Sequence, residues 1–269
     1  MDLNPWVVRD GVLVRAAGRV LVIDGETWFE RPPWRAMPMT RPRRAPRPGA
    51  HALRVHGVDV DRLDRLDEYP GGVVEGWATL TATWRHGELH TQAQEPMSTS
   101  APDAEAGRWT SPPCPPPVGG WPVVPLVGPT TAANLTASPP PQDRWAELTI
   151  TQITQFRPHP AQPVLVVAAE DPERAERALR PTFGASLCVV GSRYRQRDID
   201  AAQDRLRQEL PARRWRLTST GRSAGDDGQP TVTAEFAWIE AEVARWATTV
   251  PDGLLDADVW LTPIAASSR

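Results

Sequence analysis

Lysine is absent from this chain of 269 residues, so all 30 basic residues are arginine. Acidic residues nearly balance them at a net charge of −3, which excludes the overall positive charge typical of proteins that bind nucleic acid over their whole surface. A P-loop is excluded as well, because its phosphate-binding motif requires a lysine before serine or threonine. Any interaction with anions must therefore depend on local features.

Cysteines and long apolar runs are also scarce. Cys114 and Cys188 are the two cysteines, too few for a disulfide framework, although one bridge between them is possible. Cys188 lies in an apolar run, where a buried, unreactive thiol is expected. No segment approaches the roughly 18 continuous apolar residues of a membrane span, and the acidic N-terminus does not resemble a signal peptide. We therefore expect a cytoplasmic protein with no membrane contact.

Proline and tryptophan are abundant instead. The 12 tryptophans and 40% apolar residues indicate real hydrophobic cores, whereas the 30 prolines indicate many loops and extended segments. The length suits one large or two ordinary domains. We predict an α+β protein with a β-rich unit over residues 1–95, a proline-rich linker over 96–145 and an α+β domain over 146–269.

The first unit is predicted to be a small barrel of the oligonucleotide/oligosaccharide-binding (OB) type. Apolar and polar residues alternate from Trp77 to Trp84, which is typical of a strand, and His86–Gly87 suits a turn. Asp10–Gly11 predicts a hairpin, and residues 61–72 predict a helical turn. Short strands joined by a helical turn favour such a barrel.

The last unit is predicted to follow the order β-α-β-α-β-β-α-β, as a sandwich with helices on one face and no internal repeat. Asp171 followed by Pro172 is a strong helix start. A hairpin is expected around residues 221–230. The helix after Ser192 carries an apolar stripe made by Ile199, Ala202, Leu206 and Leu210.

Four segments together carry a resemblance. They are "EGWATLTATWRHGELHTQAQEP", "PPCPPPVGGWP", "LRPTFGASLCVVGSRYRQRDIDAAQDRL" and "VPDGLLDADVWLTPI". They resemble segments of two-module proteins from actinobacterial genomes that have no assigned activity, over most of residues 50–263. The resemblance implies an architecture and a bacterial source, and it carries over no catalytic residue.

Residues 31–49, which we call the Arg/Pro arm, are the one local charge anomaly. The arm contains six arginines, six prolines and no acidic residue. Its cations could contact phosphates and its tryptophan could stack on a base, although runs of charge are often simply solvated. The candidate nucleic-acid-binding residues are Trp34, Arg35, Arg41, Arg43, Arg44 and Arg47.

Other polar groups suggest weaker sites. Ser192 and Arg193 follow a predicted strand and precede a helix, where an anion could bind, although a plain turn is the more common outcome. His86 and His90 could share a metal on a helix, with Cys114 as a distant third ligand, but the pattern around them favours a hairpin. Asp226 and Asp227 lie in a glycine-rich loop that lacks the order of a calcium site.

No nucleophile, metal or cofactor motif is recognisable, so we expect no cofactor and no metal. The leading hypothesis is a non-enzymatic binding or scaffold protein with a protein partner. One alternative is single-stranded nucleic-acid binding through the Arg/Pro arm and the β face. Another is a carboxylate-dependent hydrolase or transferase that uses Asp226, Asp227 or Glu235.

Overall fold

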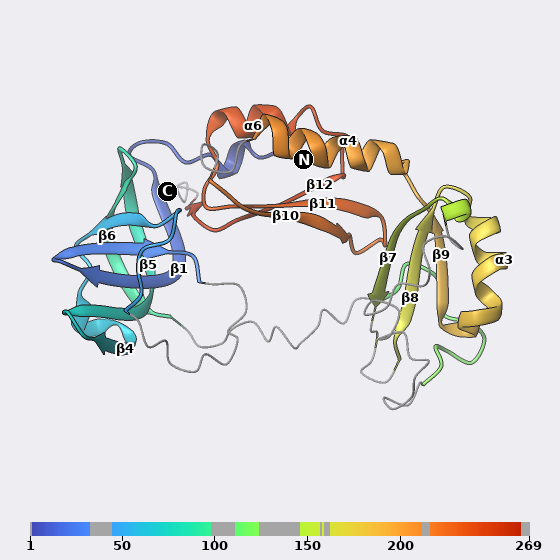
Figure 1. The fold of residues 1–269 in the computed structure, drawn as a ribbon, viewed down its shortest axis with the longest axis horizontal. Helices are drawn as coiled ribbons and strands as arrows, with labels where there is room; N and C mark the ends of the chain where they lie inside the picture. Colours follow the sequence, from blue (N-terminus) through green and yellow to red (C-terminus); the bar gives the residue numbers. More distant parts are fainter. Residues whose placement is uncertain are drawn as a thin grey trace, which may run out of the picture.

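The computed structural model describes residues 2–32, 45–97, 111–123, 146–156, 158, 162–210 and 216–264. It confirms a mixed α+β protein with a large β-sheet. A barrel lies at one end, a three-stranded sheet with two helices lies in the centre, and a second three-stranded sheet with one helix lies at the other end (Figure 1).

The barrel is closed by strands that are distant in sequence. The sheet order is β13-β1-β2-β3-β6-β5-β4, and β1 also pairs with β5, which closes β1, β2, β3, β6 and β5 into a ring. The β3–β6 pair is parallel, and the other pairs of this ring are antiparallel. The strands are β1 (Leu13–Ile23), β2 (Glu26–Glu30), β3 (Leu53–His56), β4 (Asp64–Tyr69), β5 (Val73–Arg85) and β6 (Glu88–Pro96).

Alternation along β5 builds the barrel core, as predicted. Ala78, Leu80, Ala82 and Trp84 are buried inside, while the residues between them are more exposed. Residues from the C-terminal half complete this core: Ala237, Trp238 and Leu261 are buried against it, and the Trp84 and Trp238 rings lie 5.1 Å apart. The barrel interior therefore depends on residues beyond the predicted boundary at 95.

The predicted hairpin at Asp10–Gly11 is wrong. Asp10 and Gly11 form a turn, but residues 2–9 contain no strand that could pair with β1, and Val7 bridges Ile239 instead. β1 then runs unbroken through Gly18, and its hairpin with β2 lies at Asp24–Gly25. Gly18 is needed for a close approach, because a Cβ there would lie 2.7 Å from the Phe29 ring.

The predicted helical turn over residues 61–72 is also largely wrong. Only Val60–Arg62 is helical, as the 3-10 turn η2, and β4 follows it. Leu63 packs over Gly76 of β5 at this point, where a Cβ on the glycine would lie 2.7 Å from the Leu63 Cβ. Leu63 is buried there, immediately before β4 pairs with β5.

The predicted order β-α-β-α-β-β-α-β is confirmed for the elements from β8 to β12. One further strand, β7, comes before β8 in the chain. The strands are β7 (Ile150–Phe156), β8 (Val164–Ala169), β9 (Leu187–Gly191), β10 (Leu217–Ala224), β11 (Pro230–Phe236), β12 (Leu255–Val259) and β13 (Thr262–Pro263). The helices are α3 (Pro172–Phe183), α4 (Gln196–Glu209) and α6 (Ala241–Ala247), with 3-10 turns at Asn4–Trp6 (η1), Ala146–Leu148 (η3) and Gly184–Ser186 (η4).

This half contains a repeat of topology that the sequence does not reveal. In the outer unit, β7 pairs antiparallel with β8, and α3 crosses over to a parallel β9. In the central unit, β10 pairs antiparallel with β11, and α6 crosses over to a parallel β12. Both units are therefore ββαβ, although the sequence itself shows no internal repeat.

The helix α4 connects the two units and packs on the central one. Its predicted stripe of Ile199, Ala202, Leu206 and Leu210 is buried there, and Figure 1 shows α4 and α6 on the same side of the central sheet. Among the described residues, no helix has the length and apolar character needed to cross a membrane.

The two units meet at the β10–β11 hairpin tip. Gln229 donates from its amide to the Gly191 carbonyl at 3.0 Å and accepts from the Arg193 N–H at 2.8 Å. Gly228 has φ +74°, and a Cβ there would lie 2.8 Å from Val166 of β8. The tip is therefore seated against the outer unit through polar contacts and close packing.

Candidate functional site

The outer surface of β2 and β3 carries aromatic and basic side chains because of simple strand alternation. Phe29 is buried inside the barrel, so the neighbouring Trp28 faces outward, where Arg54 pairs with it across the strands. The guanidinium carbon of Arg54 lies 5.5 Å from the Trp28 ring centroid, within the range of a cation–π contact. Arg54 is also ion-paired with Glu26.

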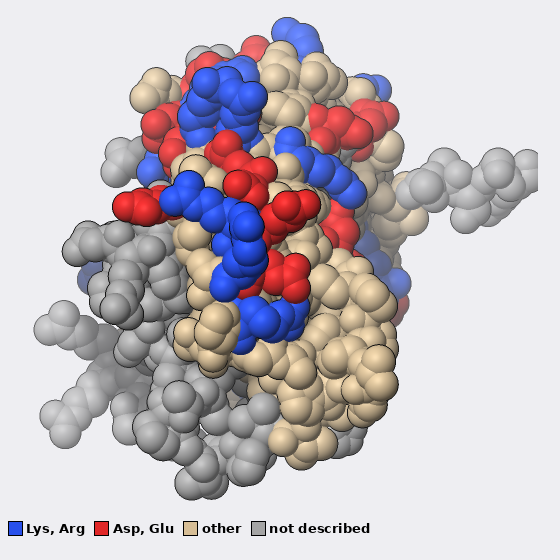
Figure 2. All heavy atoms as spheres, turned by 90° about the vertical axis from the view of Figure 1, so that its right-hand side faces the viewer, with Lys and Arg blue, Asp and Glu red and all other residues tan. Residues whose placement is uncertain are grey.

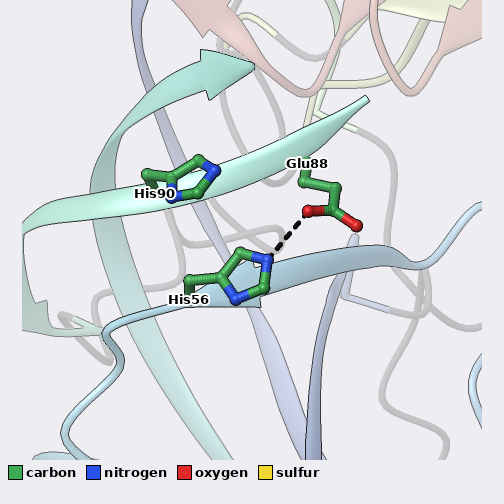
Figure 3. Close-up of side chains that lie close together, drawn as sticks. All are labelled: His56, Glu88 and His90. Atoms are coloured by element: carbon green, nitrogen blue, oxygen red, sulfur yellow. Dashed lines mark hydrogen bonds and ion pairs between the residues drawn. The ribbon is translucent and has the colours of Figure 1, made fainter. Parts of the chain in front are cut away.

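Next to this pair, two histidines and a glutamate converge on the same surface (Figure 3). The His56 and His90 rings are stacked with centroids 4.8 Å apart, and His56 Nε2 lies 2.9 Å from a Glu88 carboxylate oxygen. The His56 hydrogen bond is the main cause that lowers the pKa of Glu88. We call His56, Glu88 and His90 the histidine cluster.

The histidine cluster differs from the pair suggested by sequence spacing. His86 lies in the β5–β6 turn, where its N–H donates to Asp10 at 2.8 Å, as expected for a hairpin residue. His90 pairs instead with His56 from β3. Sequence analysis missed Arg54, His56 and Glu88, although the alternation in "LRVH" places Arg54 and His56 on one face of a strand.

A hollow of about 250 Å³ adjoins the histidine cluster beside the β1–β2 turn. The outer surface of β2 and β3 is therefore concave at this place, with a cation and an imidazole at its edge. It is lined by Gly25, Glu26, Thr27, Arg54, Val55, His56 and Gly57.

The Arg/Pro arm forms the connection between β2 and β3. Arg47 is exposed, and it is the one arm residue among the predicted nucleic-acid contacts that lies within the described residues. Trp34, Arg35, Arg41, Arg43 and Arg44 lie outside them.

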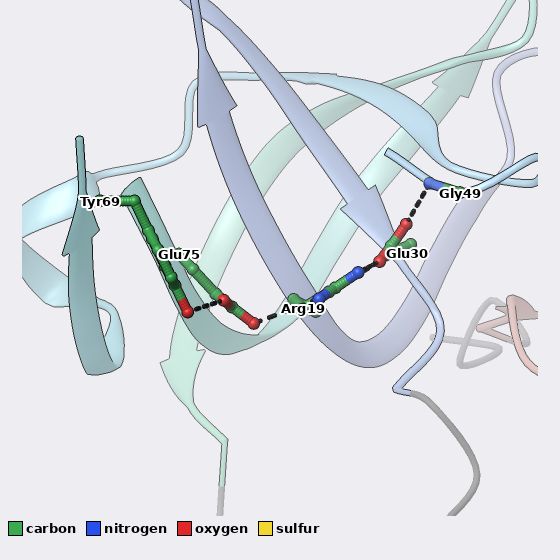
Figure 4. A network of polar contacts seen from close by, with 5 residues as sticks. All are labelled: Arg19, Glu30, Gly49, Tyr69 and Glu75. Atoms are coloured by element: carbon green, nitrogen blue, oxygen red, sulfur yellow. Dashed lines mark hydrogen bonds and ion pairs between the residues drawn. The ribbon is translucent and has the colours of Figure 1, made fainter. Parts of the chain in front are cut away.

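A polar network anchors the end of the arm at Gly49 (Figure 4). The Gly49 N–H donates to Glu30 at 2.8 Å, and Arg19 bridges Glu30 and Glu75. Tyr69 donates to Glu75 at 2.8 Å. Burial, and then this hydrogen bond, raise the pKa of Tyr69 to about 12. Four strands thus hold the arm end in place.

Both ends of the arm, at Arg31 and at Gly49, border a larger pocket of about 350 Å³ between the barrel and the central unit. Arg31 makes ion pairs there with Asp258 and with Glu235, whose carboxylate lies 3.4 Å from Nη1. The lining includes Arg19, Glu30, His51, Thr218, Ser219 and Trp260. Several ionisable side chains thus line this pocket, and its arginines and glutamates pair with one another.

The carboxylates considered for catalysis are not brought together. Glu235 lies near the end of β11 in this pocket, whereas Asp226 and Asp227 precede the start of that strand. Asp227 pairs with Arg193 at 2.8 Å. Carboxyl groups that act as acid and base in one site lie within about 10 Å of each other. Glu235 is separated from Asp226 and Asp227 by nearly the whole length of β11.

At the predicted anion site, the backbone donors are already bonded. The Ser192 N–H donates to the Ala169 carbonyl at 2.8 Å, and the Arg193 N–H donates to Gln229. The Ser192 hydroxyl donates to the Tyr194 carbonyl at 2.6 Å. An anion there stays a prediction, and it would have to displace these contacts.

Of the two states left open for Cys188, an unreactive thiol and a bridge, the structure shows the bridge, which joins it to Cys114. The bridge fastens the segment 111–123, from the predicted linker, onto β8 and β9, where Trp121 also packs. Structural disulfides are uncommon in cytosolic proteins. The cytoplasmic location stays a prediction, and a structural bridge is more typical of oxidising compartments.

No family model, no curated protein and no solved structure matches the chain. The resemblance to actinobacterial proteins and the scaffold hypothesis both stay predictions. Any functional argument must therefore start from the geometry of the barrel surface.

Proposed function

We propose that the protein binds single-stranded nucleic acid on the outer surface of β2 and β3, together with the Arg/Pro arm. The closed ring of five strands with its parallel β3–β6 pair supports an OB-like barrel. OB barrels bind oligonucleotides on the face of their second and third strands. In this chain those strands are β2 and β3, which carry Trp28 and Arg54.

One observation carries the proposal: the most basic segment of the chain is inserted between the two strands that form this face. Trp28 offers a ring on which a base can stack, and base–aromatic stacking does not depend on sequence. Arg54, which lies over this ring, can exchange its ion pair with Glu26 for a phosphate, and Arg47 of the arm is exposed to solvent. The binding is non-enzymatic, because stacking and ion pairing require no reactive group.

Because the positive charge of this protein is concentrated in one segment, the proposal predicts where on the molecule nucleic acid binds. At the opposite end of the molecule, positive and negative side chains are interleaved (Figure 2). The helix α3 at that end contains Glu173, Arg174, Glu176, Arg177 and Arg180. Binding should therefore depend on arginines of the barrel and be indifferent to arginines of α3.

Fluorescence anisotropy with labelled oligo-dT and oligo-U, at low and moderate salt, tests the proposal. Trp28→Ala should weaken binding by about 1–3 kcal/mol, because one stacked base is lost. Arg43→Ala combined with Arg44→Ala should reduce the slope of log K against log salt by about 1.4, since two phosphate contacts disappear.

Arg177→Ala is the matched control, because this exposed arginine lies on α3. It should leave both the affinity and the salt slope unchanged. The proposal is wrong if neither oligonucleotide binds at low salt, or if Trp28→Ala and Arg177→Ala give the same affinity.

A further inference from the structure

The histidine cluster has the ligand types and the placement of a metal site. β3 and β6 run parallel, and His56 lies directly opposite His90 in their register. Glu88 lies two residues before His90 on β6, so its side chain projects from the same face. The three ligand atoms all lie within 4.8 Å of one another.

We propose that His56, Glu88 and His90 bind a zinc ion on the outer surface of the barrel. Imidazole nitrogens and a carboxylate oxygen are common zinc ligands, with bonds of about 2.0–2.2 Å. Tetrahedral geometry with such bonds separates the ligand atoms by about 3.4 Å. The present separations, from 2.9 Å to at most 4.8 Å, bracket this value.

Small side-chain rotations are enough to reach this geometry. The ligands are on paired strands, so the backbone already holds their Cβ atoms on one surface. The side chains of His56 and Glu88 are 50% and 37% exposed, which leaves them free to rotate. The same exposure leaves the fourth zinc position open to water, an arrangement typical of sites that are not purely structural.

The surrounding charges permit a cation at this position. Glu88 supplies the carboxylate of the cluster, and one of its oxygens already lies 2.9 Å from His56 Nε2. Arg54 contributes a nearby positive charge, but its ion pair with Glu26 neutralises much of it. Its contact with the Trp28 ring also directs the guanidinium toward that ring. Two imidazoles and one carboxylate on a single surface therefore offer a donor set that suits a divalent ion.

Isothermal titration of zinc chloride into the untagged, chelator-treated full chain tests the site without any nucleic acid. We expect one saturable site per chain. His56→Ala and His90→Ala should each weaken binding at least about tenfold, because metal sites lose affinity strongly when their coordination is disturbed. Glu88→Gln should also weaken binding, since a neutral amide replaces the anionic ligand.

His86→Asn is the matched control. His86 lies in the adjacent turn outside the histidine cluster, at φ +50°, a conformation that asparagine tolerates. It should bind zinc like the wild type. Absence of a saturable site, or equal loss in His86→Asn and His90→Ala, would overturn the proposal.

Cobalt substitution provides a second readout. A four-coordinate site should produce visible absorption bands that disappear in His90→Ala and persist in His86→Asn. Circular dichroism of each variant checks that the barrel is folded. The nucleic-acid proposal is tested through Trp28 and the arm, so either proposal can fail without the other.

Discussion

The outer and central units share one topology but cover their sheets in different ways. In the outer unit, all six residues of β8 are buried, so both faces of the strand are covered. The helix α3 covers one face, with Ala175 and Leu179 in the core. The segment 111–123 covers the other face, through the Cys114–Cys188 bridge and Trp121.

The central unit relies on helices and on the rest of the chain. Both α4 and α6 pack on it, and Leu3 and Val7 from the N-terminus join the same core. Ala237 and Trp238, which follow β11, extend into the barrel. Prolines have no backbone N–H, so a proline-rich segment cannot join a sheet through ladder hydrogen bonds. In the outer unit such a segment covers the sheet face because a disulfide holds it there.

The largest expected effect lies in the central core. Phe236 is fully buried at the end of β11, so Phe236→Ala should lower the free energy of unfolding by about 3–5 kcal/mol. Urea denaturation followed by tryptophan fluorescence measures the change. Phe236→Leu, which leaves a smaller void, should cost less. A loss below about 1 kcal/mol for Phe236→Ala would show that the site collapses easily and is not the main core.

Much of this arrangement follows from local patterns in the sequence. The alternation in β5, the stripe on α4 and the Asp171–Pro172 helix start each determine an element with little help from tertiary contacts. The hairpin around residues 221–230 is predicted for the same reason, because its turn residues lie between two apolar runs.

The rest depends on contacts between distant residues. The Asp10–Gly11 dipeptide has residues typical of a hairpin turn. The extent of β1 is set instead by its pairing with β5, which runs from Leu13 to Val22. The histidine cluster requires the parallel β3–β6 register, which brings His56 beside His90. No local periodicity contains that register, so sequence spacing pointed to His86 instead.

Removal of the disulfide should destabilise the outer unit and leave the stability of the central unit unchanged. The bridge joins residues 74 apart in sequence, and loss of such a cross-link typically costs about 2–4 kcal/mol. Cys114→Ala should therefore speed amide exchange in β8 and β9, while α6 and β12 remain protected. Mass spectrometry of hydrogen exchange resolves these segments.

Reductant added to Cys114→Ala is the control, and it should cause no further change. Equal loss of protection in both units would contradict a local role for the bridge. It would mean that the outer and central units unfold together.

The contact between the units is the next test. Gln229 is buried and satisfies both the Gly191 carbonyl and the Arg193 N–H, so Gln229→Leu leaves two polar groups without this partner. A buried polar group that loses its hydrogen bond typically costs about 1–3 kcal/mol. Denaturation and the exchange rate of the Arg193 amide measure the effect.

Gln208→Leu is the matched control, because Gln208 is exposed on α4. Its effect should stay within about 0.5 kcal/mol. If Gln229→Leu behaves like this control, the hairpin tip is held by packing of Gly228 against Val166 rather than by the amide.

The smallest expected difference concerns the first turns of the two crossover helices. Asp171 accepts a hydrogen bond from the Arg174 N–H at 3.0 Å and so caps α3. Asp171→Ala should lower the free energy of unfolding by about 1 kcal/mol.

Glu240 occupies the same position before α6, and within the described part of the chain its side chain makes no capping bond. Glu240→Ala should therefore cost little, because burial of Val243, Ala244 and Ala247 holds α6 in place. Thermal unfolding of both variants gives the comparison, and equal losses would show that the two helices depend on their caps alike.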